Sequence, residues 1–253
     1  MSVRVYKLGG PALEDPRLIA PLAAELVATP GHKLLVHGGG RHIDRLLATL
    51  RIESRFVEGR RETSVAAMEV IEMVLSGTIN KSLASELTRA GVPAVGISGR
   101  DGGLLTARVD TGLGRVGRGV RVKPDPILGL WSVGLLPVVS PVSNGPSGES
   151  LNVNADEATL ALASALGADS LFYLSDVDGV RVGGTTASEL TSQAAEALIE
   201  DGSIDGGMAL KVRAALEASL AGIGEVVIAG RARLEGGFCG TRIVAASKVQ
   251  ATA

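Results

Sequence analysis

Cysteine and aromatic residues are scarce in this chain of 253 residues. The single cysteine, Cys239, excludes an intramolecular disulfide framework and suits a reducing compartment. All three histidines lie far upstream of Cys239, so we interpret it as a small passive residue and not as a nucleophile. Aromatic residues make up only 2% of the chain, so the core has to be built from Ala, Val, Leu and Ile.

Long apolar runs and a strong charge bias are also missing. No run of eighteen apolar residues occurs, so no membrane span is expected. The first residues, MSVRVYKLGG, have the pattern of a strand and not of a signal peptide, which makes the cytoplasm the expected location. A formal net charge of −2 gives no indication of a nucleic-acid partner or an anionic membrane.

Short apolar segments alternate with amphipathic segments along the chain. Strands are expected at residues 3–8, 34–36, 93–97, 136–140, 170–174 and 226–229. Helices are expected at residues 18–26, 41–47, 63–75, 81–90, 157–166, 189–200 and 208–221. This alternation predicts an α/β fold whose mostly parallel sheet is covered on both faces. Ligands of such folds collect at the carboxyl ends of the strands.

Glycine-rich turns follow the first two expected strands. Gly38, Gly39 and Gly40 separate an apolar run from an amphipathic helix, an arrangement that lets backbone N–H groups and the helix dipole hold an anion, most often phosphate. The alternative is a tight turn that needs glycine only for its bend. Lys7 leads into Gly9-Gly10, and a lysine buried there would require an anion. A snorkelling lysine is the alternative.

Two further polar segments stand where helices are expected to begin. Residues 151–157 read LNVNADE, which is more polar than one helix cap requires. We therefore expect a site there, with Asp156 as the partner of a lysine near phosphate; the alternative is that Asn154 or Asp156 is only a cap. Lys211 follows Gly206-Gly207-Met208, where the helix dipole disfavours a lysine unless an anion binds. An exposed lysine without a role is an equal alternative.

Three other segments bear on function. Residues 112–117, GLGRVG, match the dinucleotide pattern GxGxxG, but no helix start follows, so we reject that interpretation; a Walker A motif is absent. Residues 106–123 are expected to form a turn or hairpin whose basic side chains are solvated or contact a nucleotide or acidic ligand. Residues 65–75 form an apolar helix interrupted only by Glu69 and Glu72. It is either internal or, as we favour, crosses its symmetry mate in a dimer.

Taken in order, eight segments resemble the amino acid kinase family. They are residues 7–10 (KLGG), 37–40 (HGGG), 59–63 (GRRET), 68–81 (MEVIEMVLSGTINK), 95–104 (VGISGRDGGL), 151–159 (LNVNADEAT), 173–180 (YLSDVDGV) and 206–211 (GGMALK). The resemblance implies a three-layer αβα sandwich with a central, mostly parallel sheet, as in carbamate kinase-like folds. It also implies one domain over residues 1–253, with a substrate-binding and dimerisation half (about 1–140) and a nucleotide-binding half (about 141–253).

The resemblance implies roles for individual residues. Lys7 and Lys211 match the lysines that neutralise the transferred phosphoryl group, and Asp156 matches the carboxylate that holds both lysines. The expected substrate-binding residues are Gly39, Gly40, Arg61, Asn152 and Asn154. The expected nucleotide-binding residues are Gly9, Gly10, Gly38, Ser175, Asp176, Gly206, Gly207 and Met208. No side chain is expected to bind a metal directly, because Mg²⁺ comes with ATP and is held by its phosphates.

Within this family, the chain is most similar to enzymes that use ATP to phosphorylate the γ-carboxylate of N-acetyl-L-glutamate in arginine biosynthesis. That carboxylate, of ordinary pKa ~4.3, is ionised at neutral pH and needs no general base. Ser64 and Arg60 depart from the usual pattern, which leaves a kinase of α-aminoadipate or glutamate linked to an acidic carrier protein as the alternative. A non-catalytic amino-acid sensor is a further alternative. The resemblance also implies a homodimer that arginine does not inhibit.

Overall fold

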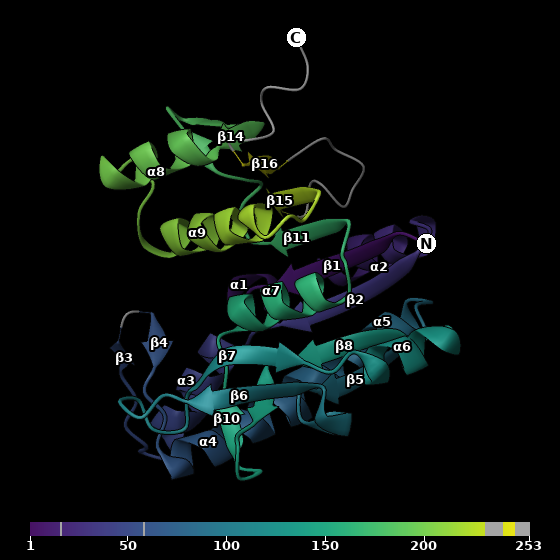
Figure 1. The fold of residues 1–253 in the computed structure, drawn as a ribbon, viewed down its shortest axis with the longest axis vertical. Coiled ribbons are helices and arrows are strands. Elements are labelled where there is room, and N and C mark those ends of the chain that lie inside the picture. The colour runs from purple at the N-terminus through teal and green to yellow at the C-terminus, as the bar shows by residue number, and fades with distance from the viewer. Residues whose placement is uncertain (16, 58, 231–239, 246–253) are drawn as a thin grey trace.

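A large sheet runs through the centre of the molecule in this computed structural model, which describes residues 1–15, 17–57, 59–230 and 240–245. Cys239 lies outside the described residues. Within them the sheet has the order β14-β16-β15-β11-β1-β2-β8-β5 (Figure 1). Its strands are β1 (Val3–Leu8), β2 (His32–His37), β5 (Ala94–Ser98), β8 (Leu136–Ser140), β11 (Ser170–Leu174), β14 (Glu189–Thr191), β15 (Glu225–Ala229) and β16 (Thr241–Val244). Every pairing is parallel except that of β15 with β16.

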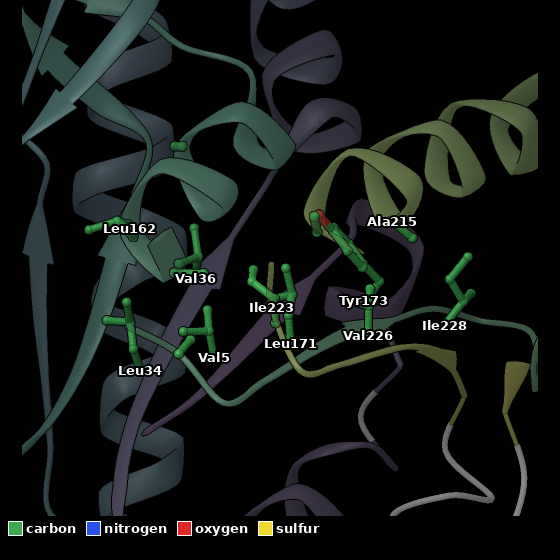
Figure 2. Packing of buried hydrophobic residues seen from close by; sticks show 14 of the residues in the cluster. Val5, Leu34, Val36, Leu162, Leu171, Tyr173, Ala215, Ile223, Val226 and Ile228 are labelled. Carbon is green, nitrogen blue, oxygen red and sulfur yellow. The ribbon is translucent and has the colours of Figure 1, made fainter. Parts of the chain in front are cut away.

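Side chains of the central strands alternate between the two faces of the sheet, as the period of an extended chain requires. One face carries Val5 and Leu34, which pack in a core with helices α6 (Asp125–Ser132), α7 (Ala155–Ala165) and α9 (Gly206–Leu220). Figure 2 shows this core with Leu162 of α7 and Ala215 of α9. The other face carries Tyr6 and Leu35, which pack with α2 (Ile19–Ala28) and α5 (Asn80–Arg89). The predicted three-layer αβα sandwich is therefore confirmed.

A smaller sheet of order β10-β9-β6-β7 covers part of the first face. It contains β6 (Leu105–Val109), β7 (Gly117–Val122), β9 (Val142–Asn144) and β10 (Ser150–Asn152). The antiparallel β6–β7 pair is the hairpin expected over residues 106–123. The GLGRVG segment leads into β7 and opens no helix, in agreement with the rejection of a dinucleotide fingerprint. Two short hairpins pair β3 (Phe56–Val57) with β4 (Arg60–Arg61), and β12 (Arg181–Val182) with β13 (Thr185–Thr186).

Two expected helices differ from the structure. Residues 189–191 form the edge strand β14, and helix α8 (Ser192–Glu200) begins only after Thr191 caps it. The helix expected at residues 63–75 begins as α4 (Val65–Glu72), capped by the Ser64 side chain, and continues as the π-helix η1 (Met73–Ile79) into α5. Neither difference can be read from the local sequence. Strand β14 forms by pairing at the edge of the sheet, and η1 packs against a glycine turn that is distant in sequence.

Helix α4 and η1 are covered on one side only. Ile71 and Leu75 are buried, but Val65 and Met73 are 58% and 56% exposed. The interpretation of this segment as an internal helix of the single chain is therefore wrong. In the described part of the chain, no helix has the length and apolar character needed to cross a bilayer.

Candidate active site

The glycine turns and the polar segment at the start of α7 meet in one cavity beyond the carboxyl ends of β1 and β2. Its volume is about 220 Å³. Its walls come from the turn between β1 and α1 (Gly10–Leu13), the turn into α3 (Gly40–Thr49), the β3–β4 hairpin and the β10–α7 connection. The lining residues include Gly10, Gly38, Gly39, Gly40, Arg60, Arg61, Asn152, Asn154 and Asp156. Segments distant in sequence converge because parallel strands end at the same edge of the sheet.

Lys7 is a buried charge that contacts Asp156, one of the residues lining the cavity. Its residue is only 7% exposed, and its Nζ lies 2.7 Å from Oδ1 of Asp156. A buried ammonium requires such a partner, since desolvation without one is strongly unfavourable. Asp156 stands in the first turn of α7, where the helix dipole favours a carboxylate. The expected lysine–Asp156 contact is present for Lys7.

Lys211 reaches the same region from α9. Its Nζ donates to Oγ of Ser175 at 2.6 Å and lies 3.9 Å from Oδ1 of Asp176. Burial lowers the pKa of Lys211, and the charge of Lys7 lowers it further, while Asp176 and Asp156 act in the opposite sense. The charge of Lys7 therefore acts on Lys211. Asp156 is in direct ionic contact with Lys7, whereas Lys211 is held by Ser175.

Lys211 does not lie in the first turn of its helix, contrary to the sequence interpretation. Helix α9 begins at Gly206, so Lys211 stands in the second turn, where the dipole argument has little weight. Gly206, Gly207 and Met208 form the first turn, outside the cavity described above. The lysine is explained instead by its side-chain bond to Ser175 at the end of β11.

The glycines divide into two groups by the use of their N–H groups. The N–H of Gly9 donates to the Leu174 carbonyl at 3.3 Å, and that of Gly38 to the Leu8 carbonyl at 3.0 Å. The N–H groups of Gly10, Gly39 and Gly40 have no acceptor among the described residues. These three are the amides that can hold an anion in the cavity. Gly38 lines the cavity without offering a free N–H group, and Gly9 is not among the lining residues.

Arg61 forms the opposite wall. It is 6% exposed, its Nη2 lies 2.6 Å from Oδ1 of Asp44, and its Nη1 donates to Oγ of Ser54 at 2.9 Å. Its guanidinium also lies 4.5 Å from the ring centre of Phe56. A planar guanidinium held in this way is suited to bidentate binding of a carboxylate.

Arg60 lies beside Arg61 on the same short strand. It forms an ion pair with Glu157, so the β3–β4 hairpin is tied to the first turn of α7. The role of Glu157 as a hairpin partner has no signal in the sequence, because ninety-seven positions separate the two residues.

The two asparagines of the polar segment have different partners. Asn152 donates from Nδ2 to Oγ1 of Thr63 at 3.1 Å, and that hydroxyl donates to the Arg61 carbonyl at 2.7 Å. Asn154 is the N-cap of α7, accepting from the N–H groups of Asp156 and Glu157. The cap interpretation is thus correct for Asn154, which also lines the cavity.

His37 is a fully buried residue to which the sequence interpretation assigned no separate role. Burial lowers the pKa of His37 to about 4, so its ring is neutral at neutral pH. The buried Asn80 lies against it and was also missed. Both residues stand within segments that resemble the family, but nothing in their spacing predicts that they touch.

A family comparison agrees with this combination of fold and cavity. Residues 2–230 match the model of the amino acid kinase family, and the chain belongs to that family. It is 43% identical over 248 residues to an acetylglutamate kinase of Bacillus velezensis, covering 95% of both chains. It is 42% identical over 250 residues to an acetylglutamate kinase of Rubrobacter xylanophilus, covering 96% of both.

Solved structures share the fold. The crystal structure of smu.665 from Streptococcus mutans has a TM-score of 0.81 at 26% identity, with 96% of this chain and 98% of that chain covered. N-acetylglutamate synthase from Neisseria gonorrhoeae, complexed with coenzyme A and N-acetyl-glutamate, has a TM-score of 0.80 at 25% identity, with 96% and 59% covered. Giardia lamblia carbamate kinase bound to AMP-PNP has a TM-score of 0.71 at 19% identity, with 96% and 98% covered, and shows a common fold alone.

Proposed function

We propose that this chain transfers the γ-phosphoryl group of ATP to the γ-carboxylate of N-acetyl-L-glutamate, forming N-acetyl-L-glutamyl 5-phosphate in arginine biosynthesis. The observation that carries the proposal is a cavity lined by Arg61 and by Asp156, whose carboxylate is ion-paired with the buried Lys7. Membership of a kinase family and 43% identity to an acetylglutamate kinase over 95% of the chain support the reaction and its acceptor.

On the substrate side, Arg61 binds the α-carboxylate of N-acetyl-L-glutamate. Its guanidinium is already held in place by Asp44 and Ser54, so the side chain loses little conformational entropy when the substrate binds. Asn152 is tied to the same strand through Thr63 and contributes its amide to the substrate. The amides of Gly39 and Gly40, and the side chain of Asn154, complete the substrate contacts.

Phosphoryl transfer rests on positioning and charge neutralisation. Lys7 and Lys211 neutralise the oxygens of the transferred group, and Asp156 holds Lys7 in the cavity while reducing the repulsion between the two lysines. The attacking carboxylate is ionised at neutral pH, so no general base is required. The neutral, buried His37 is consistent with this scheme.

The nucleotide is bound by Gly9, Gly10, Gly38, Ser175, Asp176 and the Gly206-Gly207-Met208 turn. Mg²⁺ enters as part of the substrate MgATP. No group of three or more His, Cys, Asp or Glu residues in the described ranges is arranged to hold a metal ion. We propose, as the family resemblance implies, that phosphate oxygens and water coordinate it.

We keep a division into a substrate-binding and dimerisation half, about residues 1–140, and a nucleotide-binding half, about residues 141–253. The boundary near residue 140 is approximate: β9 and β10 follow it, but β9 pairs with both β10 and β6 in one sheet, so we group these two strands with the substrate half. A homodimer is proposed through α4 and η1, whose exposed Val65 and Met73 face away from the core.

An assay of ATP turnover with a panel of acceptors tests the function. N-Acetyl-L-glutamate, L-glutamate, N-acetyl-L-aspartate and a carrier-linked α-aminoadipate are compared at equal enzyme concentration. We expect kcat/KM for N-acetyl-L-glutamate to exceed that for each of the others by at least about tenfold, because the cavity binds both ends of that substrate. A preference for the carrier-linked substrate would overturn the assignment.

A further inference from the structure

Asn80 joins three parts of the molecule from a fully buried position at the start of α5. Its Nδ2 lies 2.9 Å from the carbonyl oxygen of Val138 in β8 and 3.2 Å from that of Ile97 in β5. The same nitrogen lies 3.1 Å from Nε2 of His37 at the end of β2. Its two N–H bonds are therefore shared among three acceptors.

These partners determine the proton position on His37. The carbonyl oxygens of Ile97 and Val138 can only accept, so the amide nitrogen of Asn80 has to face them. Its Oδ1 accepts from Nζ of Lys81 at 3.2 Å, which fixes the amide in the same orientation. Nε2 of His37 then has to accept, so the ring proton is on Nδ1. That nitrogen lies 2.8 Å from the Gly38 carbonyl oxygen, to which it donates.

The hydrogen bond from Nδ1 of His37 to the Gly38 carbonyl sets the orientation of the peptide unit between Gly38 and Gly39. The N–H of Gly38 is already held by the Leu8 carbonyl, so Gly38 is fixed on both sides. In a trans peptide, the C=O and the following N–H point in opposite directions. With the Gly38 carbonyl directed at the His37 ring, the N–H of Gly39 points away from that ring. Gly39 lines the cavity and its N–H has no acceptor among the described residues.

Close packing prevents Asn80 and the glycine turn from shifting independently. A Cβ at Gly39 would lie 2.4 Å from Cδ1 of Ile79, and a Cβ at Gly96 would lie 2.2 Å from Oδ1 of Asn80. Ile79 and Asn80 stand at the junction of η1 with α5. A π-helix is rare and is often found at functional sites. Here it places both residues against the turn.

We infer that Asn80 is a positioning residue for phosphoryl transfer, which holds the Nδ1–H tautomer of His37 and through it aims the Gly39 amide into the cavity. The inference rests on the proposed function, but the tautomer is a separate observable. It predicts that Asn80 acts on the reaction without touching substrate.

The first test is ¹⁵N NMR of protein labelled at histidine. The chain has only three histidines, so His32→Gln and His42→Gln variants assign the spectrum. We expect His37 to show a protonated Nδ1 and an unprotonated Nε2 in the wild type, and a mixture of tautomers in Asn80→Leu. An Nε2–H tautomer in the wild type would overturn the inference whether or not N-acetyl-L-glutamate is a substrate.

The second test separates the two nitrogens of His37 by kinetics. His37→Asn keeps a donor near the position of Nδ1, whereas His37→Gln keeps an acceptor near Nε2 but lacks the donor to Gly38. We expect His37→Gln and Asn80→Leu to lower kcat by about tenfold or more with little change in KM for the acceptor, and His37→Asn to recover most of kcat. Equal losses in the two His37 variants would contradict the inference.

Controls separate positioning from general destabilisation. Leu87→Ala removes a fully buried side chain from the same helix α5, and it should lower the melting temperature without lowering kcat at the assay temperature. His32→Gln changes the other end of β2 and should leave kcat unchanged. If Leu87→Ala lowered kcat as much as Asn80→Leu, a purely structural role would replace the proposed one. A wild type inactive with every acceptor would refute the proposed function and leave the NMR test intact.

Discussion

At the scale of single residues, buried charge defines the site. Lys7 and Arg61 are both nearly inaccessible, and each is opposed by a carboxylate, Asp156 and Asp44 respectively. Burying such ions stabilises a fold little, because desolvation offsets most of the Coulomb attraction. The arrangement is better explained by what it offers an anionic ligand: Arg61 lines a cavity that also contains the free amides of Gly10, Gly39 and Gly40, and Lys7 lies beside it on Asp156.

Replacing either lysine tests this explanation. We expect Lys7→Ala and Lys211→Ala to lower kcat by roughly 10²- to 10³-fold while KM for N-acetyl-L-glutamate changes little, since each ammonium acts on charge in the transferred group. Steady-state kinetics give both constants. Lys123→Ala, at an exposed position, is the matched control. Unchanged kcat in both lysine variants would remove them from the mechanism.

His37 predicts a pH dependence of stability. Its pKa is about 4 in the fold and 6.5 ordinarily, so between these values the unfolded chain binds the extra proton. The stability present above pH 6.5 is therefore lost as pH falls through this window, by up to about 3 kcal/mol. Urea unfolding between these pH values should show a smaller loss of unfolding free energy for His37→Asn than for the wild type. His32→Asn should keep the wild-type slope, and equal slopes for all three proteins would refute the prediction.

At the scale of elements, the junction of α4, η1 and α5 organises the glycine turn. Leu75, Ile79 and Asn80 all contact the turn or its neighbour His37, which residues four and five apart can do together in the wider π-helix. The sequence predicted a helix here but not its π-helical part, because helical periodicity does not reveal which face a distant turn will press upon.

The contact between Gly39 and η1 can be tested by a double-mutant cycle. The φ of Gly39 is 171°, so alanine is not excluded by backbone strain, but its Cβ would meet Cδ1 of Ile79. We expect Gly39→Ala to destabilise the protein by about 1–3 kcal/mol and to lower kcat. Ile79→Val removes Cδ1 and should recover part of both losses. Strictly additive effects on unfolding free energy would show that the two residues do not couple.

At the scale of the whole molecule, the exposed side of α4 and η1 predicts self-association. Light scattering coupled to gel filtration should give twice the 25.8 kDa mass of the chain. We expect Met73→Glu to shift the protein to monomer, because it places a charge on the proposed contact. Leu128→Glu, at another exposed apolar residue on α6, should leave the dimer intact. A monomeric wild type would refute the proposal.

Insensitivity to arginine stays a prediction, which the ATP-turnover assay with N-acetyl-L-glutamate can test by adding arginine.

Local patterns were sufficient for the main strands and helices, for a mostly parallel sheet covered on both faces, and for singling out Lys7 and Asp156. Apolar segments of strand length and glycine turns are short-range signals, and these charged residues stand directly beside such turns. The family resemblance, and not a local pattern, pointed to Arg61. It also added the role of Lys211, which its helix position alone did not support.

Only the folded chain decided the rest. The strand at residues 189–191 forms by pairing with β16, which lies some fifty positions later in the sequence. Three contacts join segments that meet only when the parallel strands end at one edge of the sheet. They are the ion pairs of Arg60 with Glu157 and Arg61 with Asp44, and the hydrogen bond between Asn80 and His37. Such contacts depend on three-dimensional register, and no periodicity within a single segment encodes them.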